Sequence, residues 1–106
     1  MDNISPEERL YTALASVPIG TIIAYGELAS VAGFPGRARW VGRMLSQLPG
    51  DTQLPWHRVT NAQRRISFPL GSDRFIEQSI RLQREGLQIS STGKVSLPIN
   101  SAYLHP

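Results

Sequence analysis

The chain has 106 residues, of which 41% are hydrophobic and 18% charged, and this size predicts one globular domain with a single modest core. It contains no cysteine, which excludes disulfides, thiolate metal sites and cysteine nucleophiles, and its two histidines make a poor metal set. No stretch of about 18 apolar residues is present, so we expect no membrane partner. We likewise expect no metal, because suitable ligands are lacking, and no cofactor.

Charge is distributed unevenly along the chain. Residues 37–65 carry six arginines and one aspartate, a net charge of +5, whereas residues 1–36 carry one arginine and four acidic residues, a net charge of −3. Ten of the eleven cationic residues are arginine, whose forked guanidinium suits phosphate and base-edge contacts. The pattern favours a polyanionic partner, and on charge alone the alternative is a solvated basic face without one.

The first predicted element is a helix that begins near residue 6. Ser5 is a typical N-cap, Pro6 suits the first helical position, and Glu8 stands three residues after the cap. Apolar side chains at helical spacing then indicate one buried face, formed by Leu10, Tyr11, Leu14, Ala15 and Val17. The motif Pro18-Ile19-Gly20 ends this helix, and residues 21–24 are predicted to be a short extended segment.

Residues 26–48 have the outline of a helix-turn-helix. A short helix over residues 26–32 is stopped by Gly33-Phe34-Pro35-Gly36, and a second helix follows over residues 37–48. In the second helix Arg39 and Arg43 lie opposite an apolar face formed by Trp40, Val41, Met44, Leu45 and Leu48. A basic exposed face favours nucleic-acid binding, but the same outline occurs in proteins that never touch DNA, so the pattern alone leaves both readings open.

Residues 49–72 are rich in turn formers and are predicted to be irregular around an apolar and basic cluster at residues 54–59. A helix capped by Asp73 is then expected to run to about Glu85 and to stop at Gly86. Its inward side chains are predicted to be Phe75, Ile76, Ile80 and Leu82, and its Glu77 stands four residues before Arg81.

The last predicted element is a small hairpin. Residues 87–89 and 94–97 alternate apolar and polar side chains on either side of a Ser-Ser-Thr-Gly turn. We expect one domain over residues 1–97 and a loosely held tail over residues 98–106.

Six short motifs occur in an order and at spacings that resemble the C-terminal domain of the O6-alkylguanine-DNA alkyltransferases. They are Val17-Pro18-Ile19-Gly20, Tyr25-Gly26-Glu27-Leu28-Ala29, Gly33-Phe34-Pro35, Ala38-Arg39-Trp40-Val41-Gly42, Pro55-Trp56-His57-Arg58-Val59 and Glu85-Gly86. The resemblance covers about residues 7–89. It implies an α+β, mostly α, winged-helix-like DNA-binding domain that contains the helix-turn-helix.

The resemblance departs from the enzymes at the decisive position. In that family the fifth motif reads Pro-Cys-His-Arg-Val, and its cysteine accepts the alkyl group, whereas this chain has Trp56. An indole cannot replace a thiolate nucleophile, so the chain resembles the alkyltransferase-like proteins, which bind the lesion without repairing it. A second departure is Leu48, where the enzymes carry a hinge asparagine.

The resemblance also implies roles for three residues that contact DNA. Arg39 matches the arginine that enters the duplex and fills the gap left by a rotated nucleotide. Tyr25 matches the tyrosine that crowds the 3′ phosphate of the target, and Arg43, one turn after Arg39, is expected to contact phosphate or nothing. Without a DNA-binding role, the two arginines would be solvated helix residues and Tyr25 a half-buried core residue.

A lesion pocket is expected around Trp56. By position this side chain should form one wall of the pocket, although a tryptophan beside a proline is often simply part of a core. Val59 and the segment Ser67-Phe68-Pro69 should complete the pocket, and a backbone carbonyl near Val59 should read the exocyclic amine of guanine.

Three further residues match the proton-relay region of the enzymes. His57 and Glu85 activate the thiol in the family, but no thiol is present here. We therefore interpret His57, Arg58 and Glu85 as a retained hydrogen-bond and charge network that braces the pocket loop, with no catalytic residue in the chain.

The function that follows is binding of double-stranded DNA containing O6-alkylguanine, with flipping of the damaged nucleotide and handover to nucleotide excision repair proteins. A cytoplasmic monomer, associated with the nucleoid when it binds DNA, is expected. One alternative is a helix-turn-helix transcriptional regulator without lesion preference. The other is a glycosylase or hydrolase that uses His57 and Glu85.

Overall fold

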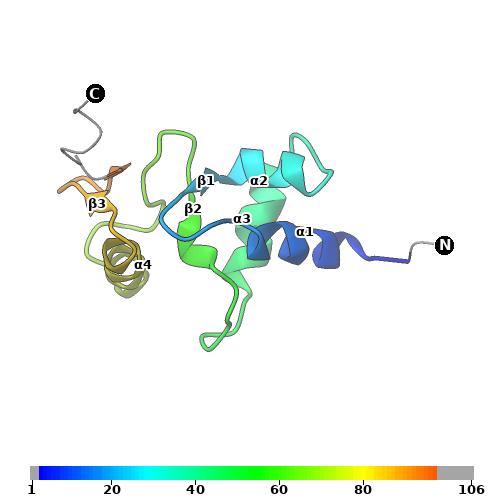
Figure 1. Cartoon of the computed structure of the whole chain (residues 1–106), viewed down its shortest axis with the longest axis horizontal. Helices are drawn as coiled ribbons and strands as arrows, with labels where there is room; N and C mark the ends of the chain where they lie inside the picture. Colours follow the sequence, from blue (N-terminus) through cyan, green and yellow to red (C-terminus); the bar gives the residue numbers. More distant parts are fainter. Residues whose placement is uncertain (1–2, 98–106) are drawn as a thin grey trace, which may run out of the picture.

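The computed structural model describes residues 3–97, which form a small α+β structure. The helices of this part are α1 (Pro6–Ala15), α2 (Tyr25–Val31), α3 (Ala38–Ser46) and α4 (Asp73–Arg84), with a 3₁₀ turn η1 (Trp56–Arg58). The strands are β1 (Ile23–Ala24), β2 (Val59–Thr60), β3 (Gln88–Ile89) and β4 (Val95–Ser96). Helices α1 to α3 gather on one side and α4 with the hairpin on the other, while η1 and β2 lie between them (Figure 1).

Helix α1 begins as the sequence predicts. The Ser5 side chain accepts a hydrogen bond of 3.1 Å from the backbone N–H of Glu8, which satisfies one donor of the first turn. Leu10 and Leu14 are fully buried, but Ala15, which we expected on the buried face, is exposed and Ala13 takes that place. The buried stripe runs through Leu10, Ala13, Leu14 and Val17. Ala15 stands one position past Leu14, about 100° further around the helix, and so points away from this stripe.

Helix α2 packs against both α1 and α3 around the larger hydrophobic cluster, which includes Leu28, Val41 and Leu45. Trp40, Met44 and Leu48 are partly buried against this cluster, while Arg39 and Arg43 are exposed. The predicted helix-turn-helix is therefore confirmed, although α3 is shorter at both ends than the predicted residues 37–48.

The segment predicted to be irregular contains two elements that local patterns do not indicate. Strand β2 pairs in parallel with β1, Ile23 opposite Val59 and Ala24 opposite Thr60. This pairing ties the residues just after Trp56 to the start of α2. It thereby fixes the position of η1 between the two halves of the molecule.

Helix α4 differs from the prediction in its cap and in its buried face. Ser72, not Asp73, is the N-cap, and its hydroxyl accepts from the N–H of Phe75 at 3.3 Å. Ile76 and Ile80 are 47% and 42% exposed, because the buried face follows Gln78 and Leu82 instead. A buried glutamine breaks the apolar pattern from which the face was predicted.

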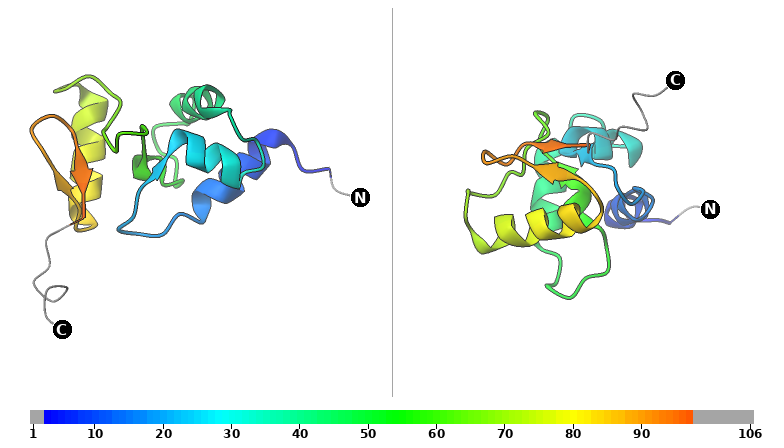
Figure 2. Two further views of the ribbon diagram at one scale, coloured as in Figure 1. Left: turned by 90° about the horizontal axis from the view of Figure 1, so that it is seen from above. Right: turned by 60° about the vertical axis from the view of Figure 1, so that its left-hand side comes forward.

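The hairpin and the stop of α4 agree with the sequence. Gly86 has a positive φ of 93° just after the helix, a conformation that glycine adopts without steric cost. Strands β3 and β4 pair antiparallel, and Arg65 pairs with Lys94 on the other side of β4. A second buried cluster lies between α4 and this small sheet and consists of Ile66, Leu82, Leu87 and Val95. Figure 2 shows α4 and the hairpin side by side. The predicted tail at residues 98–106 lies outside the described residues.

Candidate nucleic-acid interface

A cavity of about 400 Å³ lies where α2, α3, η1 and the start of α4 meet. Its lining is mostly apolar and comes from segments far apart in the sequence: Tyr25, Ala38, Arg39, Gly42, Leu45, Ser46, Trp56, Asn61, Ser67, Phe68, Arg74 and Gln78. The volume falls within the usual range for small-molecule sites, and a few polar groups converge on it. The basic helix α3 therefore forms one wall of a concave site.

Tyr25 and Ser67 join two sides of this cavity. Their hydroxyl oxygens lie 2.8 Å apart in a hydrogen bond that is exposed to solvent. Tyr25 is the first residue of α2, and its backbone position is set by the β1–β2 pair immediately before it. The polar rim of the cavity is thus anchored to the centre of the fold.

Trp56 forms an apolar wall of the cavity and is only 7% exposed. Phe68 meets it edge to face, with ring centroids 6.3 Å apart. The guanidinium carbons of Arg74 and Arg81 lie 5.3 and 5.5 Å from its ring centroid, distances at which a cation is attracted to an aromatic face. Trp56 is therefore both a buried residue and part of the cavity wall, held by an aromatic ring and two cations.

Arg74, Arg81 and Gln78 were not singled out as site residues from the sequence. The spacing of Glu77 and Arg81 correctly predicts their ion pair, which is 2.7 Å long. The spacing carries no sign that Arg81 also reaches Trp56, because that contact joins α4 to η1. Gln78 carried no signal in the sequence, because the same helix contains a second glutamine, Gln83, and only the tertiary structure buries Gln78.

The Gln78 side chain holds the backbone of the segment after Trp56 by hydrogen bonds. It is 1% exposed, and its side-chain Nε2 donates to the backbone carbonyls of His57 at 3.0 Å and Val59 at 2.9 Å. Both hydrogens of the amide are therefore used to hold the backbone of η1 and β2. The carbonyl of Val59, which we expected to read the base, has one of its two lone pairs occupied by this bond.

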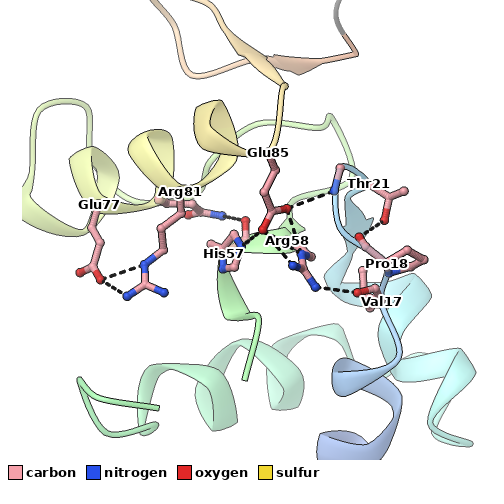
Figure 3. A network of polar contacts seen from close by, with 10 residues as sticks. Val17, Pro18, Thr21, His57, Arg58, Glu77, Arg81 and Glu85 are labelled. Atoms are coloured by element: carbon pink, nitrogen blue, oxygen red, sulfur yellow. Dashed lines mark hydrogen bonds and ion pairs between the residues drawn. The ribbon is translucent and has the colours of Figure 1, made fainter. Parts of the chain in front are cut away.

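Glu85 is the centre of an ion network that joins three parts of the chain (Figure 3). Its Oε2 lies 2.7 Å from His57 Nε2 and 2.8 Å from Arg58 Nη2, and its Oε1 accepts from Arg58 Nε at 3.0 Å and from the Gly20 N–H at 3.1 Å. Arg58 Nη1 also donates to the Val17 carbonyl at 2.8 Å. The network therefore connects the end of α4, η1 and the turn after α1.

The network changes the pKa of two of its members. Hydrogen bonds from Arg58, helped by those from His57 and Gly20, lower the pKa of Glu85 from 4.5 to about 2 in spite of its burial. Burial lowers the pKa of His57 below 6.5, against the opposing effect of Glu85. With Glu85 ionised, His57 Nε2 is the donor of their hydrogen bond and the neutral ring leaves Nδ1 unprotonated.

Most of the predicted interface residues meet at the cavity. Tyr25, Arg39, Trp56, Ser67 and Phe68 line it. Three others do not: Arg43 is exposed farther along α3, Val59 is 1% exposed within the larger hydrophobic cluster, and Pro69 is exposed beyond Phe68. His57, Arg58 and Glu85 meet in the ion network and not in the cavity lining.

In residues 3–97, the part of the chain that the structure describes, no three His, Cys, Asp or Glu side chains gather closely enough to hold a metal ion. No helix within it combines the length and apolarity needed to cross a bilayer.

Comparison with known proteins places this geometry in a family. The model of the family described as "6-O-methylguanine DNA methyltransferase, DNA binding domain" matches residues 5–87. A DNA base-flipping protein of Vibrio parahaemolyticus is 40% identical over 89 residues, which cover 84% of this chain and 87% of that protein. Alkyltransferase-like protein 1 of Schizosaccharomyces pombe is 37% identical over 97 residues, covering 85% and 87%.

A solved structure agrees with these relatives in both fold and sequence. The crystal structure of S. pombe Atl1 in complex with damaged DNA containing O6-carboxymethylguanine has a TM-score of 0.75 and 34% identity, and the match covers 93% of this chain and 94% of that one. The α+β fold predicted from the motifs is therefore confirmed. The chain belongs to the 6-O-methylguanine DNA methyltransferase DNA-binding domain family, in which it is similar to the alkyltransferase-like and base-flipping members.

Proposed function

We propose that this protein binds double-stranded DNA that contains O6-alkylguanine, flips the damaged nucleotide into the cavity beside Trp56, and leaves the alkyl group in place. The observation that carries the proposal is the position of Trp56. By the motif resemblance it takes the position of the reactive cysteine of the enzymes, and it forms a buried aromatic wall of a cavity that opens beside the basic helix α3. A flat apolar wall can contact a base and its alkyl group, but it supplies no nucleophile.

The arrangement of α3 supports the flipping step. Arg39 is exposed and also lines the cavity, so a single side chain can lie in the DNA stack while the extruded base lies next to it. Tyr25 lies on the same cavity and offers a hydroxyl at its rim, where a phosphate of the target nucleotide would pass. Arg43 extends the basic face by one helical turn and is suited to a phosphate contact.

The ion network supports a binding role in preference to hydrolysis. Each oxygen of Glu85 already accepts from at least two donors, and its lowered pKa makes it a poor base. His57 is 7% exposed and its Nε2 is occupied by Glu85, so a substrate has little access to it. We assign the three residues to bracing η1 and not to catalysis.

The relatives support the lesion class. S. pombe Atl1 was solved with O6-carboxymethylguanine, so O6 groups larger than methyl belong to the proposed class. Because the bound protein leaves the alkyl group on the base, we also propose that its complex marks the lesion for nucleotide excision repair. The protein would act on DNA as a monomer.

The test compares matched duplexes that differ only in one base, guanine or O6-methylguanine. We expect tighter binding to the alkylated duplex, because a weakly paired base costs less to extrude. Mass spectrometry after long incubation should find no alkyl mass gained by the protein. Equal affinities, with a preference for one sequence, would instead favour a transcriptional regulator, and a released base would favour a glycosylase.

A further inference from the structure

The guanidinium of Arg74 is a cation in the wall of the cavity that forms no ion pair with the described residues 3–97. Its central carbon lies 5.3 Å from the Trp56 ring centroid and 5.7 Å from that of Phe68, so it stands beside both aromatic walls. Arg74 is half-buried. Within residues 3–97 it makes no ion pair, because Glu77, one turn along α4, holds Arg81 instead.

The charged residues that line the cavity are all positive. Two of its residues, Arg39 and Arg74, are cationic, and no aspartate or glutamate of the described chain lines it. Neutral O6-alkylguanine does not need such a charge, since a methyl or ethyl group is satisfied by the apolar walls. The five N–H donors of the Arg74 guanidinium likewise have no hydrogen-bond acceptor among residues 3–97.

Arg74 lies where its charge can act on the group attached to O6 of the flipped guanine. Under the proposed function, the group on O6 of the flipped guanine lies against Trp56, and Arg74 is beside the same ring. An anionic end on that group would therefore meet a guanidinium in a site that is partly shielded from water. A carboxylate fits the planar fork with two parallel hydrogen bonds, which a neutral group of the same shape cannot match in strength.

We propose that Arg74 makes the cavity selective for O6 adducts that carry a carboxylate. The inference rests on the proposed function, because it needs the lesion to enter the cavity beside Trp56. The proposed function concerns whether the protein recognises an adduct at all, whereas this inference concerns whether it distinguishes a charged adduct from a neutral one. A purely structural Arg74, whose cation only packs on Trp56 and Phe68, would be indifferent to that charge.

The experiment uses two adducts of equal size and shape. Duplexes containing O6-carboxymethylguanine or its neutral amide, O6-carbamoylmethylguanine, are titrated with the full chain at one salt concentration. Because a charge-assisted hydrogen bond exceeds a neutral one by about 1 unit in log affinity, the wild type should prefer the carboxylate about tenfold. Arg74→Gln should lower that ratio to about one, and Arg74→Lys should keep part of it.

The matched control is Arg84→Gln, an exposed arginine of the same helix that does not line the cavity. It lowers the charge of the protein equally and should leave the carboxylate preference unchanged. A wild-type ratio near one, or a preference that survives Arg74→Gln, would overturn the inference. Binding of O6-methylguanine relative to guanine, measured in parallel, keeps the two hypotheses apart: if that selectivity holds while the carboxylate preference is missing, only the role of Arg74 fails.

Discussion

The hydroxyl groups of Tyr25 and Ser67 form a 2.8 Å hydrogen bond between residues 42 positions apart, at the exposed rim of the cavity. Tyr25 comes from the start of α2 and Ser67 from the segment that precedes α4. A phosphate would accept the hydrogen of the Tyr25 hydroxyl, and the Ser67 hydroxyl can then donate to the Tyr25 oxygen. The hydroxyl that joins two sides of the free cavity is therefore also the one that we expect to contact DNA.

Removing the Tyr25 hydroxyl should weaken DNA binding more than removing the Ser67 hydroxyl. Tyr25→Phe removes a hydroxyl that we expect to bind phosphate, so affinity for the alkylated duplex should fall about tenfold, the usual worth of a hydrogen bond to a charged group. Ser67→Ala leaves the Tyr25 hydroxyl free and should change the affinity much less. Fluorescence anisotropy with both variants measures this, and equal losses would indicate that the bond matters only for the shape of the cavity.

Arg39→Ala should weaken the flipped-base complex more than the loss of one phosphate contact does, because an unfilled gap leaves neighbouring bases unstacked. Arg65→Ala is the comparison, since Arg65 is exposed and does not line the cavity. It should weaken normal and alkylated duplexes alike and reduce the slope of log affinity against log salt by up to about 0.9. A fluorescent base in the duplex reports extrusion. An intact extrusion signal with Arg39→Ala would make Arg39 an ordinary phosphate contact.

Trp56→Cys should restore little or no alkyl transfer. Arg74, Arg81 and Phe68 pack on the indole, so the smaller side chain leaves a void and should lower the free energy of unfolding by about 3 kcal/mol. A reactive thiolate must also be aligned with the alkyl carbon, and by the motif resemblance Leu48 replaces the hinge asparagine that supports the loop in the enzymes. Mass spectrometry of the variant after incubation with alkylated DNA measures the transfer. Rapid stoichiometric demethylation would mean that the tryptophan alone separates binder from enzyme.

The stability of the protein should depend on pH through Glu85. Its pKa is about 2 in the folded protein against 4.5 for an ordinary glutamate, so its contribution is complete above pH 4.5 and is lost as the pH falls toward 2. The lowered pKa of His57 acts in the same direction, but its effect begins as the pH falls below 6.5. Urea unfolding of the wild type at several pH values should show the free energy of unfolding decreasing through both ranges.

Glu85→Gln separates the two contributions. It should lower the free energy of unfolding by roughly 2 to 3 kcal/mol at pH 7 and flatten its decrease below pH 4.5. Glu77→Gln is the control: it breaks a half-exposed ion pair with Arg81, so the loss should be under about 1 kcal/mol. An unchanged acid profile in Glu85→Gln would contradict the role assigned to this network.

Local features of this protein could be predicted because the groups that produce them are near neighbours in the chain. The Ser5 cap and the Glu77–Arg81 ion pair join residues three and four positions apart, and Gly86 needs only its own backbone freedom. The family was predicted in the same way, because its motifs are short and occur in a characteristic order. The missing cysteine and Trp56 were likewise evident from the sequence alone, and they carry the proposal that the protein binds without catalysis.

The tertiary structure alone decided which of these residues meet. Trp56 is held by Arg74 and Arg81, Gln78 fixes the carbonyls of His57 and Val59, and Gly20 reaches Glu85 across 65 residues. Such contacts depend on how helices and strands pack, and helical spacing predicted the wrong inward face for Ile76 and Ile80 because it could not anticipate a buried glutamine. The amino-acid pattern therefore limits which faces a helix can bury, whereas packing decides the face that is buried, and the charge and shape of a cavity arise only where several elements converge.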